Sequence, residues 1–169
     1  MITLIGYRGS GKSTVAPALA ARLGFEWTDA DVVLEAAAGA SIREIFAAEG
    51  ETGFRRRERE TLVKLLARDR LVLAAGGGAV LNPETRRDLK SAGPVVWLRA
   101  GLETLAARIA GDPATAGRRP ALAGGGTQEI ATLLSVREPM YRECASLIVD
   151  TDGLPVAEIV ERICRELSF

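Results

Sequence analysis

Histidine is absent from the sequence, and cysteine is rare. The lack of histidine excludes Ser-His-Asp hydrolysis, histidine-ligated metals and acid–base catalysis by histidine. The two cysteines, Cys144 and Cys164, lie in stretches of helical periodicity and lack CxxC or metal-ligand spacing. We therefore expect two reduced thiols that are packed in the core. The chemistry is left to carboxylates, arginines and Lys12.

Net charge and long apolar runs are also lacking. Lys plus Arg and Asp plus Glu both total 22, so no global basic field attracts nucleic acid or an anionic membrane. The first apolar run, Ile2–Ile5, meets Gly6 far short of a membrane span or of the apolar region of a signal peptide. We therefore expect a cytoplasmic monomer that binds neither nucleic acid nor membrane and holds anions locally.

The chain has the size and pattern of one α/β domain. Its 169 residues, 47% of them hydrophobic, can fill a single core, so we expect one domain over residues 1–169. Stretches of helical period separate short aliphatic or β-branched runs. Because parallel strands need long crossovers, this alternation predicts a parallel sheet with helices on both faces. The expected strands are Ile2–Ile5, Phe25–Thr28, Leu71–Ala75, Val95–Leu98 and Leu147–Val149.

Residues Gly6–Ser13 read GYRGSGKS, which matches the P-loop pattern GxxxxGK[ST] between a strand and a helix. The glycines let backbone N–H groups turn toward phosphate, and the helix adds the positive end of its dipole. Lys12 should contact the β- and γ-phosphates of ATP, and Ser13 should supply a hydroxyl to Mg²⁺. The expected nucleotide-binding residues of this loop are Gly9, Ser10, Gly11, Lys12, Ser13 and Thr14.

Helix starts are marked at three further places. Ser41 with Glu44 forms a capping box, Asn82 precedes a proline, and Pro155 opens the last helix. The last helix carries one apolar stripe, which we expect to pack on the sheet. The stripe consists of Val156, Ile159, Val160, Ile163 and Leu167. Pro17 fits the helix after the P-loop poorly, because it removes a backbone hydrogen bond.

Two aspartates follow the second expected strand. If Asp29 and Asp31 both lie in the strand, their carboxylates point to the same side. Ligands of open α/β sheets bind at the carboxyl ends of the strands, so this pair should face the same crevice as the P-loop. The two carboxylates could divide Mg²⁺ neutralisation and orientation of an acceptor hydroxyl between them. The alternative is a turn with helix-capping aspartates.

A triple glycine and several arginines complete the candidate site. Gly76–Gly78 closes the third strand, where it either brings bare backbone close to a ligand or makes a tight turn. Arg55 and Arg137 could be parts of a solvated charged surface. If they reach the crevice, their forked donors suit a carboxylate, which implies an acceptor that is both an acid and an alcohol.

The segment 111–126 reads GDPATAGRRPALAGGG, with Arg118 and Arg119 adjacent in its middle. It could be a surface loop. Long irregular segments in compact domains are often lids, so we expect a functional lid here.

In their order along the chain, these motifs resemble the shikimate kinase family over nearly the whole length. The resemblance is carried by GYRGSGKST, DAD, SIREIFAAEGETGFRRRE, AAGGGAVL, GRRPAL, REPMY and LIVDT. It implies a doubly wound, five-stranded parallel sheet of order 2-3-1-4-5 of the P-loop kinase type. It also implies an acceptor-binding segment at about 31–60 and a mobile lid at about 111–126.

The resemblance implies roles for individual residues. Asp31 would orient the attacking hydroxyl, Asp29 would join the Mg²⁺ shell through water, and Arg119 would reach the phosphates when the lid closes. Shikimate would be bound by Asp31, Arg55, Gly77 and Arg137, with support from Glu58, and Pro155 would lie near the nucleotide base. The chain departs from the family where the lid reads RPAL rather than RPLL, and where Asp112 falls near the position of an adenine-stacking arginine.

The implied reaction converts ATP and shikimate to ADP and 3-phosphoshikimate, a step of chorismate and aromatic amino acid biosynthesis. Lys12, Mg²⁺ and Arg119 would counter the charge on the transferred group. One alternative is another small-acid kinase, such as a gluconate kinase. A second is a regulatory module that binds nucleotide without catalysis, although the intact Lys12, Ser13 and Asp31 argue against it.

Overall fold

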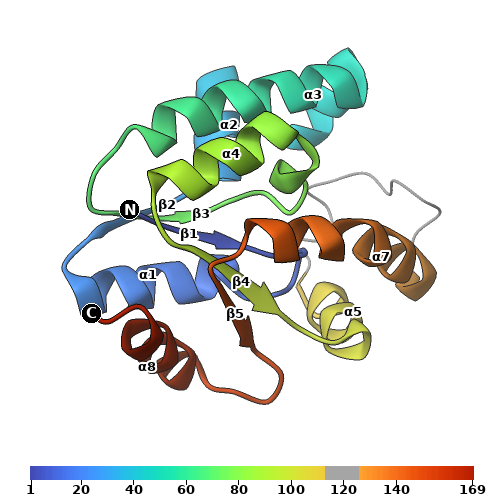
Figure 1. Cartoon of the computed structure of the whole chain (residues 1–169). Helices are drawn as coiled ribbons and strands as arrows, with labels where there is room; N and C mark the ends of the chain where they lie inside the picture. The colour runs from blue at the N-terminus through green and yellow to red at the C-terminus, as the bar shows by residue number, and fades with distance from the viewer. Residues whose placement is uncertain (113–125) are drawn as a thin grey trace.

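The computed structural model describes residues 1–112 and 126–169, and in this part the chain forms one five-stranded parallel sheet (Figure 1). The strand order is β2-β3-β1-β4-β5, and every neighbouring pair is parallel. The strands are β1 Ile2–Ile5, β2 Glu26–Asp29, β3 Leu71–Ala74, β4 Val95–Arg99 and β5 Leu147–Asp150. The predicted order is confirmed, and each predicted strand agrees with the structure to within one residue at either end.

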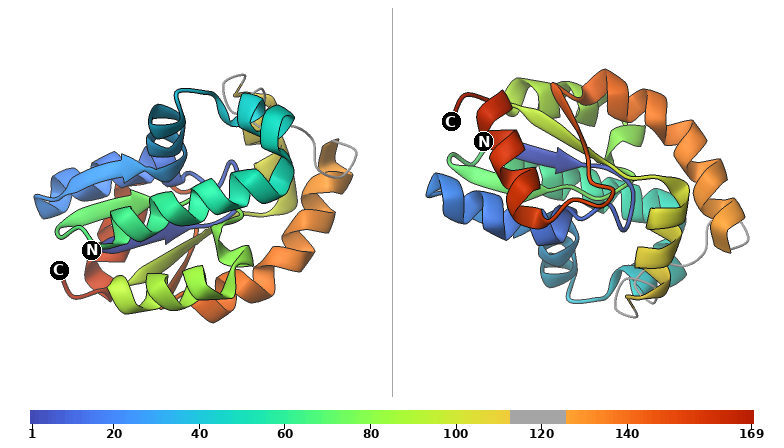
Figure 2. Two further views of the ribbon diagram at one scale, coloured as in Figure 1. Left: turned by 90° about the horizontal axis from the view of Figure 1, so that it is seen from above. Right: turned by 90° about the horizontal axis from the view of Figure 1, so that it is seen from below.

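Helices cover both faces of the sheet, as the two views of Figure 2 show. Side chains alternate between the faces, so Leu4 packs among α1 and α8 while Leu73 packs among α3, α4 and α7. Since both faces are covered, the central strands are mostly apolar, with Thr3 in β1 and the terminal Arg99 of β4 as exceptions. The helices are α1 Lys12–Leu23, α2 Ala30–Ala38, α3 Ile42–Leu66, α4 Pro83–Ala92, α5 Leu102–Ala110, α7 Gly126–Cys144 and α8 Val156–Glu166, with a short 3₁₀ helix, η1, at Ala79–Leu81.

The predicted helix starts are confirmed. The Ser41 hydroxyl accepts a hydrogen bond from the Glu44 N–H, and the Glu44 carboxylate accepts one from the Ser41 N–H. Asn82 caps α4 through its side-chain oxygen, and Pro155 occupies the N-cap of α8. The long α3 consists of two helical stretches that meet at a kink at Gly50, where φ is 68° and ψ is −173°. Glycine adopts this φ without the steric cost of a side chain.

The thiols and the last helix are packed as expected. Ile159, Val160 and Ile163 of α8 are buried in the cluster that covers one face of the sheet. Cys144 and Cys164 are both free and buried. Burial raises the pKa of the Cys144 thiol to about 11, so this group is protonated at neutral pH.

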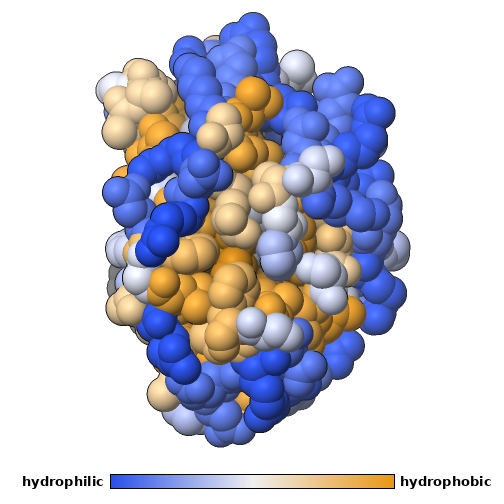
Figure 3. Space-filling view, turned by 60° about the vertical axis from the view of Figure 1, so that its left-hand side comes forward, coloured by the Kyte–Doolittle hydropathy of each residue, from blue (hydrophilic) through white to orange (hydrophobic). Residues whose placement is uncertain are grey.

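Both termini lie on the side of the molecule opposite the carboxyl ends of the strands (Figure 1). Figure 3 is turned so that this side comes toward the viewer, and it shows a continuous hydrophobic area bordered by hydrophilic residues. Large apolar side chains that remain exposed include Trp27 on β2 and the terminal Phe169. Within residues 1–112 and 126–169, no helix has the length and apolar character needed to cross a membrane.

The proline inside α1 should lower the stability of the protein. Pro17 lies inside α1, where it cannot donate to the carbonyl one turn earlier, at Ser13. Pro17→Ala restores that donor but adds backbone freedom to the unfolded chain, so we expect the free energy of unfolding to rise by about 1 to 2 kcal/mol. Urea unfolding measures the change. Pro83→Ala is the matched control, because Pro83 opens α4 and removes no helical bond there. Equal effects of the two substitutions would contradict this account.

Candidate active site

The P-loop connects the central strand β1 to α1. A side-chain carbon added at Gly6 would lie 2.4 Å from the carbonyl oxygen of Leu98, so only glycine fits where the loop leaves the sheet. Lys12 turns back into the loop, and its Nζ donates to the carbonyl oxygens of Gly6 and Tyr7, each at 2.9 Å. The loop therefore encloses the lysine amino group at the N-terminus of α1, an arrangement suited to binding an anion.

A cleft of about 440 Å³ lies over the P-loop, and most of the predicted site residues line it. The loops that follow strands β1 and β3 line the cleft. The cleft therefore lies at the carboxyl edge of the sheet, as expected for an open α/β fold. The predicted residues that line it are Gly9, Ser10, Gly11, Lys12, Ser13, Thr14, Asp29, Asp31, Gly77 and Arg137.

The two aspartates line the cleft from the end of β2 and the start of α2. The two carboxylates do not both lie in the strand, because β2 ends at Asp29 and Asp31 belongs to the first turn of α2. Asp29 caps α2, and its Oδ1 accepts a hydrogen bond from the Asp31 N–H at 2.9 Å. The other carboxylate oxygen, Oδ2, accepts one from the Ser13 hydroxyl at 2.6 Å. The capping alternative is therefore correct for Asp29, and the capping residue also faces the P-loop serine.

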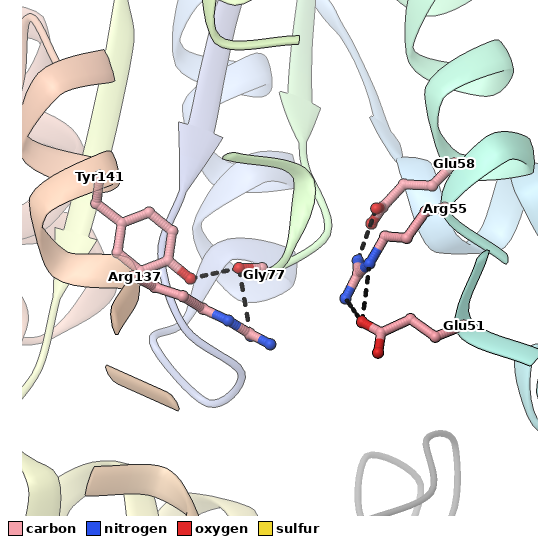
Figure 4. A network of polar contacts seen from close by, with 6 residues as sticks. All are labelled: Glu51, Arg55, Glu58, Gly77, Arg137 and Tyr141. Carbon is pink, nitrogen blue, oxygen red and sulfur yellow. Dashed lines mark hydrogen bonds and ion pairs between the residues drawn. The ribbon is translucent and has the colours of Figure 1, made fainter. Parts of the chain in front are cut away.

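Arg55 and Arg137 approach from opposite helices, and Figure 4 shows their guanidinium groups directed toward the space between α3 and α7. Arg137 is only 7% exposed and contacts the carbonyl oxygen of Gly77 at 3.5 Å. Arg55 pairs with Glu51 at 3.1 Å and with Glu58 at 2.7 Å. Arg55 and Glu58 line a second cavity of about 420 Å³, so the structure divides the predicted acceptor residues between two neighbouring hollows.

The triple glycine lies between these two arginines. The carbonyl oxygen of Gly77 accepts hydrogen bonds from the Tyr141 hydroxyl at 2.5 Å and from Arg137. A side-chain carbon on Gly77 would lie 3.3 Å from the carbonyl oxygen of Gly6. One on Gly78 would lie 2.3 Å from Nη1 of Arg55. The bare backbone therefore lets this loop touch the P-loop on one side and an arginine on the other.

Glu58 carries an unsatisfied buried oxygen. Its side chain is 6% exposed, and while one oxygen binds Arg55, Oε1 has no hydrogen-bond partner in the part of the chain that the structure describes. A buried carboxylate oxygen without a donor costs free energy, so the site fits a ligand that supplies a hydroxyl or N–H group there.

Arg108 was not predicted as a site residue. The predicted position of an adenine-stacking arginine fell near Asp112 instead. Arg108 lines the cleft from α5, with Nη1 3.3 Å from the Gly9 carbonyl oxygen and Nη2 3.0 Å from the Thr151 carbonyl oxygen. Asp112 lines the same cleft one helical turn later, so searching for a basic residue at the i−4 spacing would have found Arg108.

Pro155 does not line the cleft, although its neighbours Leu154 and Val156 do. Arg119, and with it most of the expected lid, lies outside the described residues.

The shikimate kinase family model matches residues 8–168. The chain belongs to this family. A shikimate kinase of Rhodopirellula baltica is 44% identical over 163 residues, which cover 96% of this chain and 87% of that protein. The structure of a shikimate kinase from Acinetobacter baumannii in complex with shikimate is 36% identical, covers 99% of this chain and 92% of that chain, and has a TM-score of 0.92.

A gluconokinase from Sinorhizobium meliloti also aligns, with 20% identity, a TM-score of 0.60, and coverage of 99% of this chain and 95% of that chain. At this identity the likeness extends to the fold alone. The comparisons therefore confirm the resemblance to shikimate kinases and give the gluconate alternative no support beyond a shared architecture.

The contact between Gly78 and Arg55 can be tested by substitution. Gly78 has a φ of −102°, which alanine tolerates, so Gly78→Ala adds no backbone strain, and any loss in the free energy of unfolding, up to about 3 to 5 kcal/mol, should come from unpairing the buried Glu58. The added methyl group should displace the Arg55 guanidinium from Glu58, which a crystal structure of the variant would reveal. Gly39→Ala is the control, because Gly39 has open space around it and a φ of 63°, where alanine costs about 1 to 2 kcal/mol. An unmoved Arg55 in the Gly78→Ala structure would refute the steric argument.

Proposed function

We propose that the protein transfers the γ-phosphoryl group of ATP to the 3-hydroxyl of shikimate, giving ADP and 3-phosphoshikimate. The observation that carries this proposal is the pair of arginines, Arg55 and Arg137, on the two sides of the glycine loop that touches the P-loop. Two forked cations suit a carboxylate, and the nearby P-loop suits a nucleotide. The family to which the chain belongs supports shikimate as the acid that carries the acceptor hydroxyl.

On the nucleotide side, Lys12 would exchange the carbonyl oxygens of Gly6 and Tyr7 for the β- and γ-phosphates. The backbone of Gly9, Gly11 and the first turn of α1 would hold the same phosphates. Arg108, already bonded to the P-loop at Gly9, offers a planar cation to the nucleotide on the α5 side of the cleft.

Ser13 and Asp29 fit a magnesium ion. Their oxygens lie 2.6 Å apart, which brings a hydroxyl and a carboxylate together beside Lys12, and Asp29 would act through a water molecule. Residues 1–112 and 126–169 contain no group of three or more His, Cys, Asp or Glu side chains able to hold a metal. The ion would therefore take its other ligands from phosphate and water, and it would neutralise charge on the phosphates when bound.

On the acceptor side, Arg137 and Arg55 would bind the shikimate carboxylate, and Gly77 would border the ring. Glu58 would accept a hydrogen bond at its unsatisfied Oε1. Asp31 would hold the attacking hydroxyl in line with the γ-phosphate and would accept its proton. The segment 31–60, which supplies Asp31, Arg55 and Glu58, would then be the acceptor-binding part of a single domain.

The lid at about 111–126 would complete the site by bringing Arg119 to the phosphates and by excluding water. The protein would act in the cytoplasm as a monomer. A gluconate kinase and a regulatory module without catalysis are the alternatives to exclude.

The substrate assignment predicts a definite pattern of turnover. ADP release should require Mg²⁺ and should be stimulated by shikimate but not by gluconate, because only shikimate matches the family to which the chain belongs. A coupled assay of ADP release across a panel of hydroxy acids measures this. Greater stimulation by gluconate would refute the substrate while retaining a kinase, and no stimulation by any acid would favour the regulatory module.

The lid proposal predicts unequal effects of two neighbouring arginines. Arg119→Ala should lower kcat by about a hundredfold or more and weaken ATP binding less, because the charge of Arg119 acts mainly in the transition state. Arg118→Ala should be milder and is the matched control, since the family motif falls on the residue before proline. Steady-state kinetics of the two variants measures this difference. A near-normal kcat for Arg119→Ala would contradict the lid mechanism.

A further inference from the structure

Tyr7 belongs to the phosphate-binding loop and to the wall of the cleft at once. Its backbone carbonyl oxygen accepts a hydrogen bond from Lys12 Nζ at 2.9 Å. The residue also lines the cleft and is 4% exposed. The GxxxxGK[ST] pattern leaves this position open, so the phosphate-binding chemistry of the loop does not by itself demand an aromatic ring here.

The ring of Tyr7 lies under the guanidinium of Arg137. The Arg137 Cζ atom is 5.5 Å from the ring centroid, within the range of a cation–π contact. Within the described residues the one hydrogen bond of Arg137 is a long one, at 3.5 Å to the Gly77 carbonyl oxygen. The ring is therefore a main contact of this nearly buried cation, whose guanidinium is directed toward the space between α3 and α7 (Figure 4).

The ring is itself held in place. It packs in an apolar cluster with Ala100, Leu105 and Ile130, which come from the end of β4, from α5 and from α7. Burial raises the pKa of the Tyr7 hydroxyl above its usual value, against the opposing charges of Arg137 and Arg8, so the ring is neutral at physiological pH. A fixed, neutral ring presents its negative face to the arginine.

We propose that Tyr7 is a positioning residue for the acceptor: its ring orients the Arg137 guanidinium toward the carboxylate of shikimate. Because Tyr7 is itself a residue of the phosphate-binding loop, it connects the acceptor arginine to that loop. A preorganised cation loses less conformational freedom when the acid binds. This inference rests on the proposed function, in which Arg137 binds the shikimate carboxylate.

Steady-state kinetics of Tyr7→Leu and Tyr7→Phe tests the proposal. Tyr7→Leu keeps an apolar side chain but removes the ring, so the KM for shikimate should rise about 5- to 30-fold while kcat and the KM for ATP change by about twofold or less. Tyr7→Phe retains the ring and should restore wild-type KM. An equal rise in both KM values for Tyr7→Leu, or a Tyr7→Phe variant as weak as Tyr7→Leu, would overturn the proposal.

Two comparisons exclude a merely structural effect. Adding Tyr7→Leu to Arg137→Ala should cause no further rise in the KM for shikimate, since the ring acts through that arginine, and additive losses would count against it. Phe25→Leu is the matched control. It removes a ring 5.3 Å from Arg70, at the start of the edge strand, and should leave both KM values unchanged.

If Tyr7→Leu does not fold, phenylalanines with increasing numbers of ring fluorines at position 7 keep the shape and weaken the negative face of the ring. The KM for shikimate should then rise with each fluorine, and a flat series would overturn the proposal. A wild-type protein that does not turn over shikimate would refute the proposed function. Normal turnover, an Arg137→Ala variant with raised KM and a flat fluorine series would refute only the role of Tyr7.

Discussion

The close approach of the P-loop backbone to the sheet is the constraint on which the rest of the structure depends. Gly6 leaves the central strand so near the Leu98 carbonyl oxygen that any side chain would collide with it. Because β1 lies between β3 and β4, the loops that follow those strands flank the P-loop on both sides. One of these neighbours is the triple glycine, and the other leads into α5 with Arg108. The cleft thus follows from strand order and from the absence of side chains at a few positions.

The two acceptor arginines are held in physically different ways. Arg55 lies in an ion-pair group with Glu51 and Glu58, of which Glu51 is largely exposed. Glu51 can be exchanged for a ligand at small cost, because exposed ion pairs contribute little, whereas Glu58 is buried and its pairing with Arg55 is costly to break. Arg137 is buried against a ring and a carbonyl group, where rearrangement would expose an unpaired charge to an apolar wall. One arginine is therefore preformed for a ligand, while the other must give up part of its present pairing.

The sequence predicts the scaffold closely and the details of the cleft less well. Strands such as Ile2–Ile5 were recognisable because they are short, mostly apolar runs that are buried on both faces. The start of α3 was recognisable because Ser41 and Glu44 form a capping box within four residues. For Asp29 and Asp31 the sequence left strand geometry and helix capping both open, because the alternation of side chains does not reveal where a helix begins. Arg108 was missed because its part in the cleft depends on how α5 packs across the P-loop. Apart from its i−4 spacing from Asp112, such a contact between distant segments has no local signal in one sequence.

The position of the chain ends has a practical consequence. The N- and C-termini lie on the same side of the molecule, away from the edge of the sheet where the cleft opens (Figure 1). An affinity tag, a fluorescent protein or a surface linker joined to either terminus would project from the opposite side. Immobilised protein would then present its cleft to the flowing solution. This geometry suits surface-based binding measurements, in which nucleotide and acid are titrated over the same tethered molecules.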